Sequence, residues 1–273
     1  MKLCVIGGAG ARSAFLTKSL VKSARDIRVD HIVLLDNDQQ KLKTYGEISR
    51  ELARRLDPDL TFEVTSDARA ALTGVDYIIT TIRAGEDAGR LFDEQTCLAH
   101  GVLGQETTGA GGFAMAIRSV PTLVYYCTLA REVANPGHLI FNFTNPSGII
   151  TQALRSKGFD NVYGICDAPS GFIKQLEEIL EIPYGTLDIE CYGLNHLSWF
   201  RNAKVNGRDV QRELLDNPRT YEHSEMRLFT REMARISGDC MLNEYLYFYY
   251  RRVKSLSMIQ KADHPRGEMI YLI

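Results

Sequence analysis

The sequence predicts an α/β protein: a doubly wound parallel sheet of the Rossmann type, followed by a partial α+β domain. Three observations carry this prediction. Apolar, strand-like runs alternate with helical patterns through the first part of the chain. A glycine-rich turn directly follows the first run. After Asp167 the rhythm changes to a strand pair and then to mostly helical sequence. We therefore expect one domain at residues 1–167 and a second, incomplete domain at residues 168–273.

The strands of the first domain are predicted from short runs that are apolar throughout. They lie at residues 2–6, 31–35, 61–64, 77–82, 139–143 and 162–165. Helical periodicity and stop signals predict helices at residues 13–23, 39–56, 113–133 and 147–157. Strands without polar alternation indicate a sheet that helices cover on both faces. In the second domain, residues 187–192 and 197–205 predict a strand pair.

The composition is that of an ordinary globular protein: 273 residues, 45% apolar and 24% charged, with a net charge of −2. Because the basic residues are spread along the chain, neither nucleic acid nor an anionic membrane is expected as a partner. We find no signal peptide, no apolar run of bilayer length and no CxxC pair among the six cysteines. These features predict a cytoplasmic protein with reduced thiols. The last residues, HPRGEMIYLI, look like a helix that stops early, so we expect a C-terminally truncated chain.

The turn after the first strand, VIGGAGARS, carries Gly7, Gly8 and Gly10. Glycines at such a turn let the backbone approach a pyrophosphate, which then sits at the N-terminus of the following helix. Asp36 closes the second strand, where an acid accepts a hydrogen bond from the adenosine ribose of NAD. The pattern departs from GxGxxG, because Ser13 stands at the third glycine position. We predict NAD binding, with a flavodoxin-like or nucleotide-sugar fold without nicotinamide as the alternative.

Several polar residues follow strands at the carboxyl edge of the sheet, where doubly wound folds bind ligands. Glu106 lies in GVLGQETTGAGGF, a loop with more glycines than packing alone explains. Arg83 follows the fourth strand, Asn145 follows the fifth, and Asn195 lies in YGLNHLSW. Arg83 has an alternative as a surface ion pair, and Asn145 has one as a turn residue before proline. Their common placement favours a functional site.

Cys166, Asp167 and His196 predict a metal centre. The Cys166 thiol lies just before a predicted helix, whose N-terminal dipole favours the thiolate. A thiolate and an imidazole leave coordination positions open for substrate oxygens, as in a catalytic site. The alternative for His196 is a core histidine with satisfied hydrogen bonds, and the cysteine–aspartate pair could be a frayed strand end.

Together, these motifs resemble glycoside hydrolase family 4, the NAD- and metal-dependent glycosidases, and are most similar to its 6-phospho-β-glucosidases. The similar segments run along essentially the whole chain: IGG, LLDND, IRAGE, GQETTGAGG, NFTNPSG, GICD, YGLNH and EYLYFYY. The resemblance implies a second domain like the C-terminal domain of lactate and malate dehydrogenases. It also implies a redox route, which is an exception to hydrolysis by two carboxylates. NAD⁺ takes hydride from C3 of the sugar, a base removes the C2 proton, and the C1 substituent leaves. Water is then added and the hydride is returned.

The resemblance also implies a role for each matching residue. Cys166 and His196 would bind a divalent metal, usually Mn²⁺, and Tyr245 would be the base at C2. Asp167 would protonate the leaving oxygen. Contacts to the sugar or the cofactor would come from Arg83, Glu106, Asn145, Asn195 and Arg266, the last gripping the 6-phosphate. Tyr245 has a structural alternative, because it belongs to an aromatic helical segment that could be core or subunit interface.

The sequence departs from the family pattern in three places. Asp167 stands where β-acting members usually have Asn and where α-acting members have Asp. The start reads IGGAG followed by ARSAF, in place of IGGGS and Thr-Pro, and family members are longer than 273 residues. The alternatives are therefore a 6-phospho-α-glucosidase or another family 4 glycosidase, an NAD-dependent 2-hydroxy-acid dehydrogenase, and a truncated NAD-binding module without turnover. The implied partners are a phosphorylated disaccharide or glucoside, and further copies of the chain in a dimer or tetramer.

Overall fold

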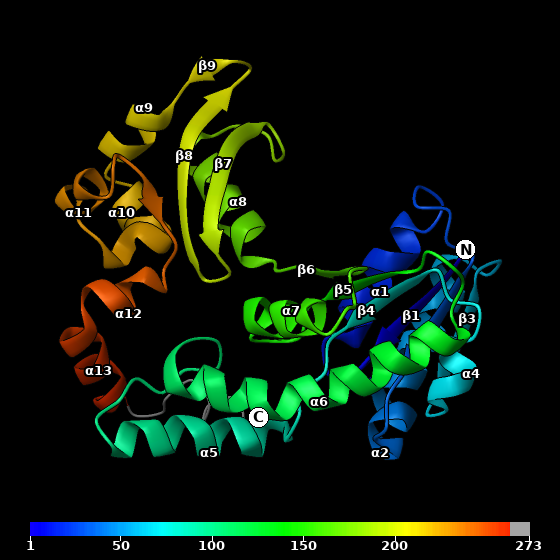
Figure 1. Ribbon diagram of the computed structural model, residues 1–273. Coiled ribbons are helices and arrows are strands. Elements are labelled where there is room, and N and C mark those ends of the chain that lie inside the picture. The colour runs from blue at the N-terminus through cyan, green and yellow to red at the C-terminus, as the bar shows by residue number, and fades with distance from the viewer. Residues whose placement is uncertain (263–273) are drawn as a thin grey trace. The chain divides into compact units, whose positions relative to one another are not determined.

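The first part of the chain forms a six-stranded parallel sheet. The computed structural model describes residues 1–262, and the chain divides into two units, Met1–Arg90 with Gly112–Ile165, and Leu91–Gly111 with Cys166–Ile273. The strands of the first unit are β1 (Lys2–Ile6), β2 (His31–Leu35), β3 (Thr61–Thr65), β4 (Tyr77–Thr80), β5 (Leu139–Asn142) and β6 (Val162–Gly164). Their order is β3-β2-β1-β4-β5-β6 and all neighbours are parallel (Figure 1). This order is that of a Rossmann sheet and confirms the predicted fold class.

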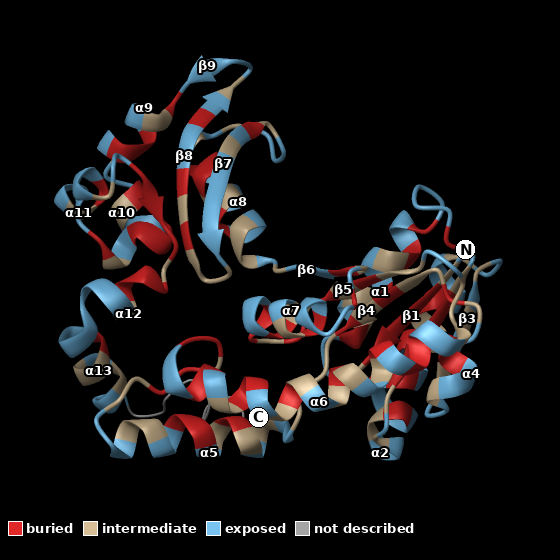
Figure 2. Cartoon of the chain, viewed as in Figure 1, coloured by how far each residue is buried: buried red, intermediate tan, exposed pale blue. Residues whose placement is uncertain are grey.

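Helices cover both faces of this sheet, as the strand composition predicts. They are α1 (Ser13–Ser23), α2 (Gln39–Lys41), η1 (Leu42–Gly46), α3 (Glu47–Leu56), α4 (Ala68–Leu72), α6 (Gly109–Val133) and α7 (Ser147–Ser156). Helix α5 (Glu86–Ala99) contributes no residue to the two cores of the sheet. Alternate side chains of β1 supply two separate cores. Val5 packs with buried residues of α1 and α3, whereas Cys4 packs with buried residues of α4, α6 and α7. Figure 2 shows β1 as a buried strand. Because packing on both faces holds this strand in place, the turn that follows its carboxyl end starts from a fixed position.

The units differ from the predicted domains in two places. Residues 1–167 were expected to form one domain, but Leu91–Gly111 belong to the second unit, and so do Cys166 and Asp167. The chain crosses the boundary inside α5 and again inside α6, where continuous helical hydrogen bonding leaves no break in composition to mark it.

Helix α6 corrects the expectation that no apolar segment is long enough to cross a bilayer. Of the helices in residues 1–262, it alone is long and apolar enough to match a membrane span. Its residues Leu123, Cys127 and Ala130 are buried against the parallel sheet. A helix that covers a sheet in a core meets the same criterion of length and composition.

The second unit contains an antiparallel sheet with helices packed on one face. Its strands are β7 (Leu187–Leu194), β8 (Leu197–Val205), β9 (Arg208–Asp209) and β10 (Met241–Leu242), paired in the order β10-β8-β7 with β9 on β8. Its helices are α8 (Ala168–Leu180), α9 (Gln211–Asp216), α10 (Thr220–His223), η2 (Glu225–Leu228), α11 (Arg231–Ile236), α12 (Leu246–Tyr250) and α13 (Arg252–Gln260). Phe172 of α8 and Phe200 of β8 meet edge to face at 4.9 Å in its core. The strand pair β7–β8 confirms the predicted pair, and it holds a tight turn between its strands.

Candidate active site

The centre of the candidate site is a thiol–imidazole pair in the second unit. Cys166 precedes α8, and its Sγ accepts a hydrogen bond from the Ala168 amide at 3.5 Å. His196 lies in the β7–β8 turn with φ at +57°, a conformation that side-chain-bearing residues adopt rarely. The Sγ atom of Cys166 and Nε2 of His196 are 3.6 Å apart. Two residues that are thirty positions apart in sequence are thus brought together by a helix start and a strained turn.

The spacing of this pair fits one metal ion. Metal–sulfur and metal–imidazole bonds of about 2.3 and about 2.1 Å at a tetrahedral angle place sulfur and nitrogen about 3.6 Å apart. Among residues 1–262, no group of three or more His, Cys, Asp or Glu side chains is arranged to hold a metal. The Oδ1 atom of Asn195, the residue before His196, is buried, and no donor among residues 1–262 reaches it. The chain therefore offers two strong ligands and a neighbouring acceptor, and an ion held here would keep positions open for water or substrate.

Asp167 lies at the edge of the same cluster. It is the N-cap residue of α8, and the Cys166 Sγ approaches its Oδ1 at 3.9 Å. Its side chain makes no capping hydrogen bond to the helix. The carboxylate therefore does not cap α8, and it lies beside the thiol, where it could contact a group bound at the thiol–imidazole pair.

Tyr245 faces the imidazole of His196. The two rings stack with centroids 4.4 Å apart and planes 24° from parallel. Tyr245 is only 6% exposed, while Tyr249 and Tyr250 of the same segment are exposed at 50% and 44%. Tyr247 packs instead in the core of the unit. Of these four tyrosines, Tyr245 is the one that the structure directs to the thiol–imidazole pair.

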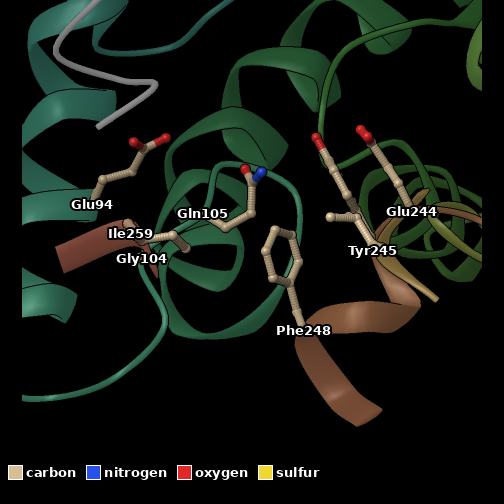
Figure 3. Close-up of a pocket in the computed structure, with 8 residues that line it drawn as sticks. Glu94, Gly104, Gln105, Glu244, Tyr245, Phe248 and Ile259 are labelled. Carbon is tan, nitrogen blue, oxygen red and sulfur yellow. The ribbon is translucent and has the colours of Figure 1, made fainter. Parts of the chain in front are cut away.

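A pocket of about 190 Å³ adjoins Tyr245. Gln105, Phe248, Glu94 and Glu244 also line it, as Figure 3 shows. The sequence singled out Glu106 in this loop, but Gln105 is the neighbour that lines the pocket. Gln105 lies in the same motif, GQETTGAGG, as Glu106. The sequence alone does not show which of these two neighbouring side chains faces the pocket.

The glycines of this loop correct one expectation. They were expected to be more numerous than packing requires, yet two of them are required by close packing. A Cβ on Gly104 would lie 2.3 Å from the Glu94 carbonyl oxygen, and a Cβ on Gly111 would lie 2.7 Å from the Gln105 carbonyl oxygen. These glycines let the loop lie directly against α5 and against its own backbone, which fixes Gln105.

In the glycine-rich turn of the first unit, two glycines are needed for close packing and a third borders open space. Gly7 has φ at +82°, and a Cβ there would lie 2.7 Å from the Thr81 carbonyl oxygen. A Cβ on Gly8 would lie 2.9 Å from Val5 O and from Leu34 Cβ, whereas one on Gly10 would meet nothing within 4 Å. Gly7 and Gly8 are thus required by the fold, and Gly10 leaves open space at the helix start. That space fits the pyrophosphate cradle expected of a dinucleotide site.

Asp36 closes this cradle. Its Oδ2 accepts a hydrogen bond from the Ala9 amide and its Oδ1 accepts one from the Asp38 amide, both at 3.1 Å. A carboxylate has about four acceptor positions, so ribose hydroxyls can still be bound. Lys41, five residues after Asp36, forms ion pairs with Asp38 at 3.3 Å and with Glu86 at 3.6 Å.

Other predicted residues of the first unit have structural partners. Arg83 Nη1 forms a 2.6 Å ion pair with Asp87 Oδ1, and its side chain is 28% exposed. Its role in sugar or cofactor binding stays a prediction. Asn145 precedes Pro146 through a cis peptide bond. Its loop is held by a buried residue that the sequence did not single out, Asn142, whose Nδ2 donates to the Thr144 carbonyl at 3.3 Å and to the Ser147 carbonyl at 3.4 Å. The predicted phosphate-binding Arg266 lies outside the described residues.

The fold places the chain among Rossmann-type proteins that carry a second α+β unit. Lactate dehydrogenase from Eimeria maxima has this fold, with a TM-score of 0.59 at 14% identity over 94% of this chain and 74% of its own. The chain belongs to family 4 of the glycosyl hydrolases: residues 2–182 match the family and residues 191–271 match its C-terminal domain.

Named relatives agree with this membership. The 6-phospho-beta-glucosidase BglT of Thermotoga maritima is 35% identical over 219 residues, which are 80% of this chain and 51% of that protein. A solved structure of the Thermotoga maritima enzyme, with NAD and glucose-6-phosphate, has a TM-score of 0.88 at 30% identity and covers 100% of this chain and 64% of its own. A 6-phospho-alpha-glucosidase from gut microorganisms, in complex with NAD and Mn2+, has a TM-score of 0.89 at 26% identity, with 99% and 65% covered. The chain thus spans about half to two thirds of the length of these relatives.

Proposed function

We propose that this chain is the cofactor- and metal-binding part of a glycosidase that hydrolyses 6-phospho-glucosides. The observation that carries the proposal is the assembly of Cys166, His196 and Tyr245, in which a buried phenol stacks on an imidazole placed 3.6 Å from a thiol. This assembly suits the removal of a proton next to a group held by a metal. The membership of glycosyl hydrolase family 4 and the relatives named for 6-phospho-glucosides support the same substrate class.

The residues that would hold the cofactors lie in separate units. Gly7, Gly8 and Gly10 with Asp36 would bind NAD, and Cys166 with His196 would bind the divalent ion. When bound, NAD⁺ supplies reversible hydride transfer at C3 of the sugar, and an ion such as Mn²⁺ supplies Lewis acidity toward the sugar oxygens. We favour NAD over NADP, because Asp36 and Asp38 are acidic and Lys41 is already paired with Asp38 and Glu86.

Tyr245 would take the proton from C2. Its ring is buried and held flat against His196, so the phenol oxygen needs little reorganisation before the transfer. Asp167, beside Cys166, would give a proton to the leaving oxygen at C1 and could then accept one from the incoming water. Gln105 and Phe248, which line the pocket next to Tyr245, would contact the sugar or its aglycone.

The identity of Asp167 supports a second candidate, the α anomer. A carboxylic acid can donate a proton to a departing glycosidic oxygen, whereas an asparagine amide cannot. Similarity to both β- and α-acting relatives leaves each anomer to be tested as a substrate.

The test is an assay of p-nitrophenyl 6-phospho-β-glucoside and its α anomer with NAD⁺, Mn²⁺ and a reductant. We expect release of p-nitrophenol from one anomer, which should depend on NAD⁺ and on Mn²⁺ and should be abolished by EDTA. Cys166→Ser should abolish it, and Cys191→Ser, which changes an exposed cysteine on β7 of the same unit, should not. Release that is insensitive to EDTA, or equal in Cys166→Ser, would contradict the proposal.

A further inference from the structure

The segment that carries Tyr245 is held by hydrogen bonds to one buried asparagine. Asn243 follows β10, and its backbone N–H donates to the Ser198 carbonyl at 3.1 Å. Its Oδ1 accepts from the Tyr245 N–H at 3.2 Å, and its Nδ2 donates to Glu225 at 2.9 Å. Asn243 is 2% exposed, so each of these bonds is shielded from water. The backbone position of Tyr245 therefore depends on the orientation of the Asn243 side chain.

Glu225 fixes that orientation. Its Oε2 accepts from Asn243 Nδ2 and also from the Glu244 backbone N–H, at 2.9 and 2.8 Å. Glu225 begins η2, and its own N–H donates to the Gln175 side chain of α8 at 3.0 Å. One carboxylate oxygen thus accepts from the Asn243 side chain and from the Glu244 backbone. The backbone of Glu225 is in turn bound to α8, the helix that Cys166 precedes.

The surroundings of Glu225 disfavour its ionised form. Glu225 is 8% exposed, and burial raises its pKa from 4.5 to about 7. Glu244 on the adjoining segment adds to the rise, and the hydrogen-bond donors with Arg227 offset it only in part. Arg227 is shared, because it also pairs with Glu244 at 3.5 Å. The two donors need an acceptor oxygen at this position, which both a carboxyl group and a glutamine amide provide.

We propose that Glu225 is a positioning residue that holds the Tyr245 ring against His196. Its carboxylate orders Asn243 and Glu244, these set the backbone of Tyr245, and Tyr245 stacks on the imidazole 3.6 Å from the thiol. The catalytic meaning of this role rests on the proposed function. The placement of the Tyr245 ring is tested without cofactor, metal or turnover. The positioning role of Glu225 and the proposed function can therefore fail separately.

The test is the nuclear Overhauser contact between the ring protons of Tyr245 and His196 in the metal-free chain, labelled in tyrosine and histidine. Glu225→Met keeps the length of the side chain and removes both acceptors. We expect the contact to weaken severalfold in this variant and to be restored in Glu225→Gln, whose amide oxygen still accepts.

Glu177 provides a matched control in the same unit. It is 2% exposed, and its Oε1 accepts from the backbone N–H groups of Thr186 and Leu187 at 2.8 and 3.0 Å, at the start of β7. Glu177→Met therefore removes an equally buried, doubly bonded carboxylate that does not bind the 243–245 segment. We expect its Tyr245–His196 contact to equal that of the unchanged protein.

Two results would overturn the proposal. The first is an unchanged ring contact in folded Glu225→Met, or a loss of equal size in Glu177→Met.

The second result comes from hydrogen exchange in the unchanged protein. We expect the Glu244 and Tyr245 amides to exchange with solvent as slowly as the amides of the β8–β10 ladder. Exchange at the rate of exposed amides would show that the carboxylate does not hold the segment.

Discussion

Replacing Glu225 by glutamine should change how the stability of the second unit depends on pH. The folded protein holds the Glu225 carboxyl at a pKa of about 7, against 4.5 for the ordinary group. A carboxyl whose pKa is raised by folding stabilises the fold fully below the lower value, and this contribution is lost as the pH rises through the higher one. Since one pKa unit corresponds to about 1.4 kcal/mol, the loss between pH 4.5 and pH 8 amounts to about 3 kcal/mol.

Glutamine cannot ionise, so the Glu225→Gln variant should lack this loss. The free energy of unfolding of the unchanged protein, minus that of the variant, should fall by about 3 kcal/mol from pH 4.5 to pH 8. Other titrating groups largely cancel in this difference. Denaturant unfolding followed by tryptophan fluorescence measures it, because the single tryptophan, Trp199, lies on β8 of the same unit. A difference that is independent of pH, or that rises with pH, would refute the reasoning.

Three further predictions concern the cofactor sites and the base. Cys166→Ser or His196→Ala should weaken Mn²⁺ binding at least about 100-fold while NAD binding is kept, measured by calorimetry; equal Mn²⁺ affinity would exclude the site. Gly8→Ala should cost about 1–3 kcal/mol in thermal unfolding because its Cβ has no space, whereas Gly10→Ala should leave stability unchanged and weaken NAD binding; the reverse pattern would contradict the cradle. Tyr245→Phe keeps the stacked ring and removes the hydroxyl, so hydrolysis should fall by at least about 100-fold with Mn²⁺ binding unaltered; retained turnover would assign the base elsewhere.

Much of the first unit could be predicted because local sequence determines it. The runs KLCVI and HIVLL become β1 and β2 at the predicted bounds, since each is apolar on both faces and ends in turn residues. The predicted helix at residues 39–56 is continuous but includes the wider turn η1 between α2 and α3. Helix α5 was not predicted, because its acidic start and charged interior hide the apolar periodicity. Without α5, nothing in the sequence assigned Leu91–Gly111 to the second unit.

Some residues of the candidate site could be predicted from local sequence, and others could not. Cys166 and His196 each have a local signal, a thiol before a helix and a histidine in a strand turn, and the structure brings them together at 3.6 Å. Glu225 and Asn243 have no such signal, because their roles arise from hydrogen bonds between segments eighteen residues apart. Local patterns can identify groups with unusual chemistry, whereas the side chains that position them emerge only from packing. The catalytic and binding roles of the predicted residues stay predictions until they are tested.

The central claim is that hydrolysis proceeds through removal of the C2 proton of the sugar. The most direct measurement is turnover of a 6-phospho-glucoside in D₂O with NAD⁺ and Mn²⁺, followed by proton NMR of the sugar phosphate released. The account predicts deuterium at C2 of the product, because a proton taken by Tyr245 exchanges with solvent before it is returned. A product that keeps its original C2 hydrogen would contradict the account.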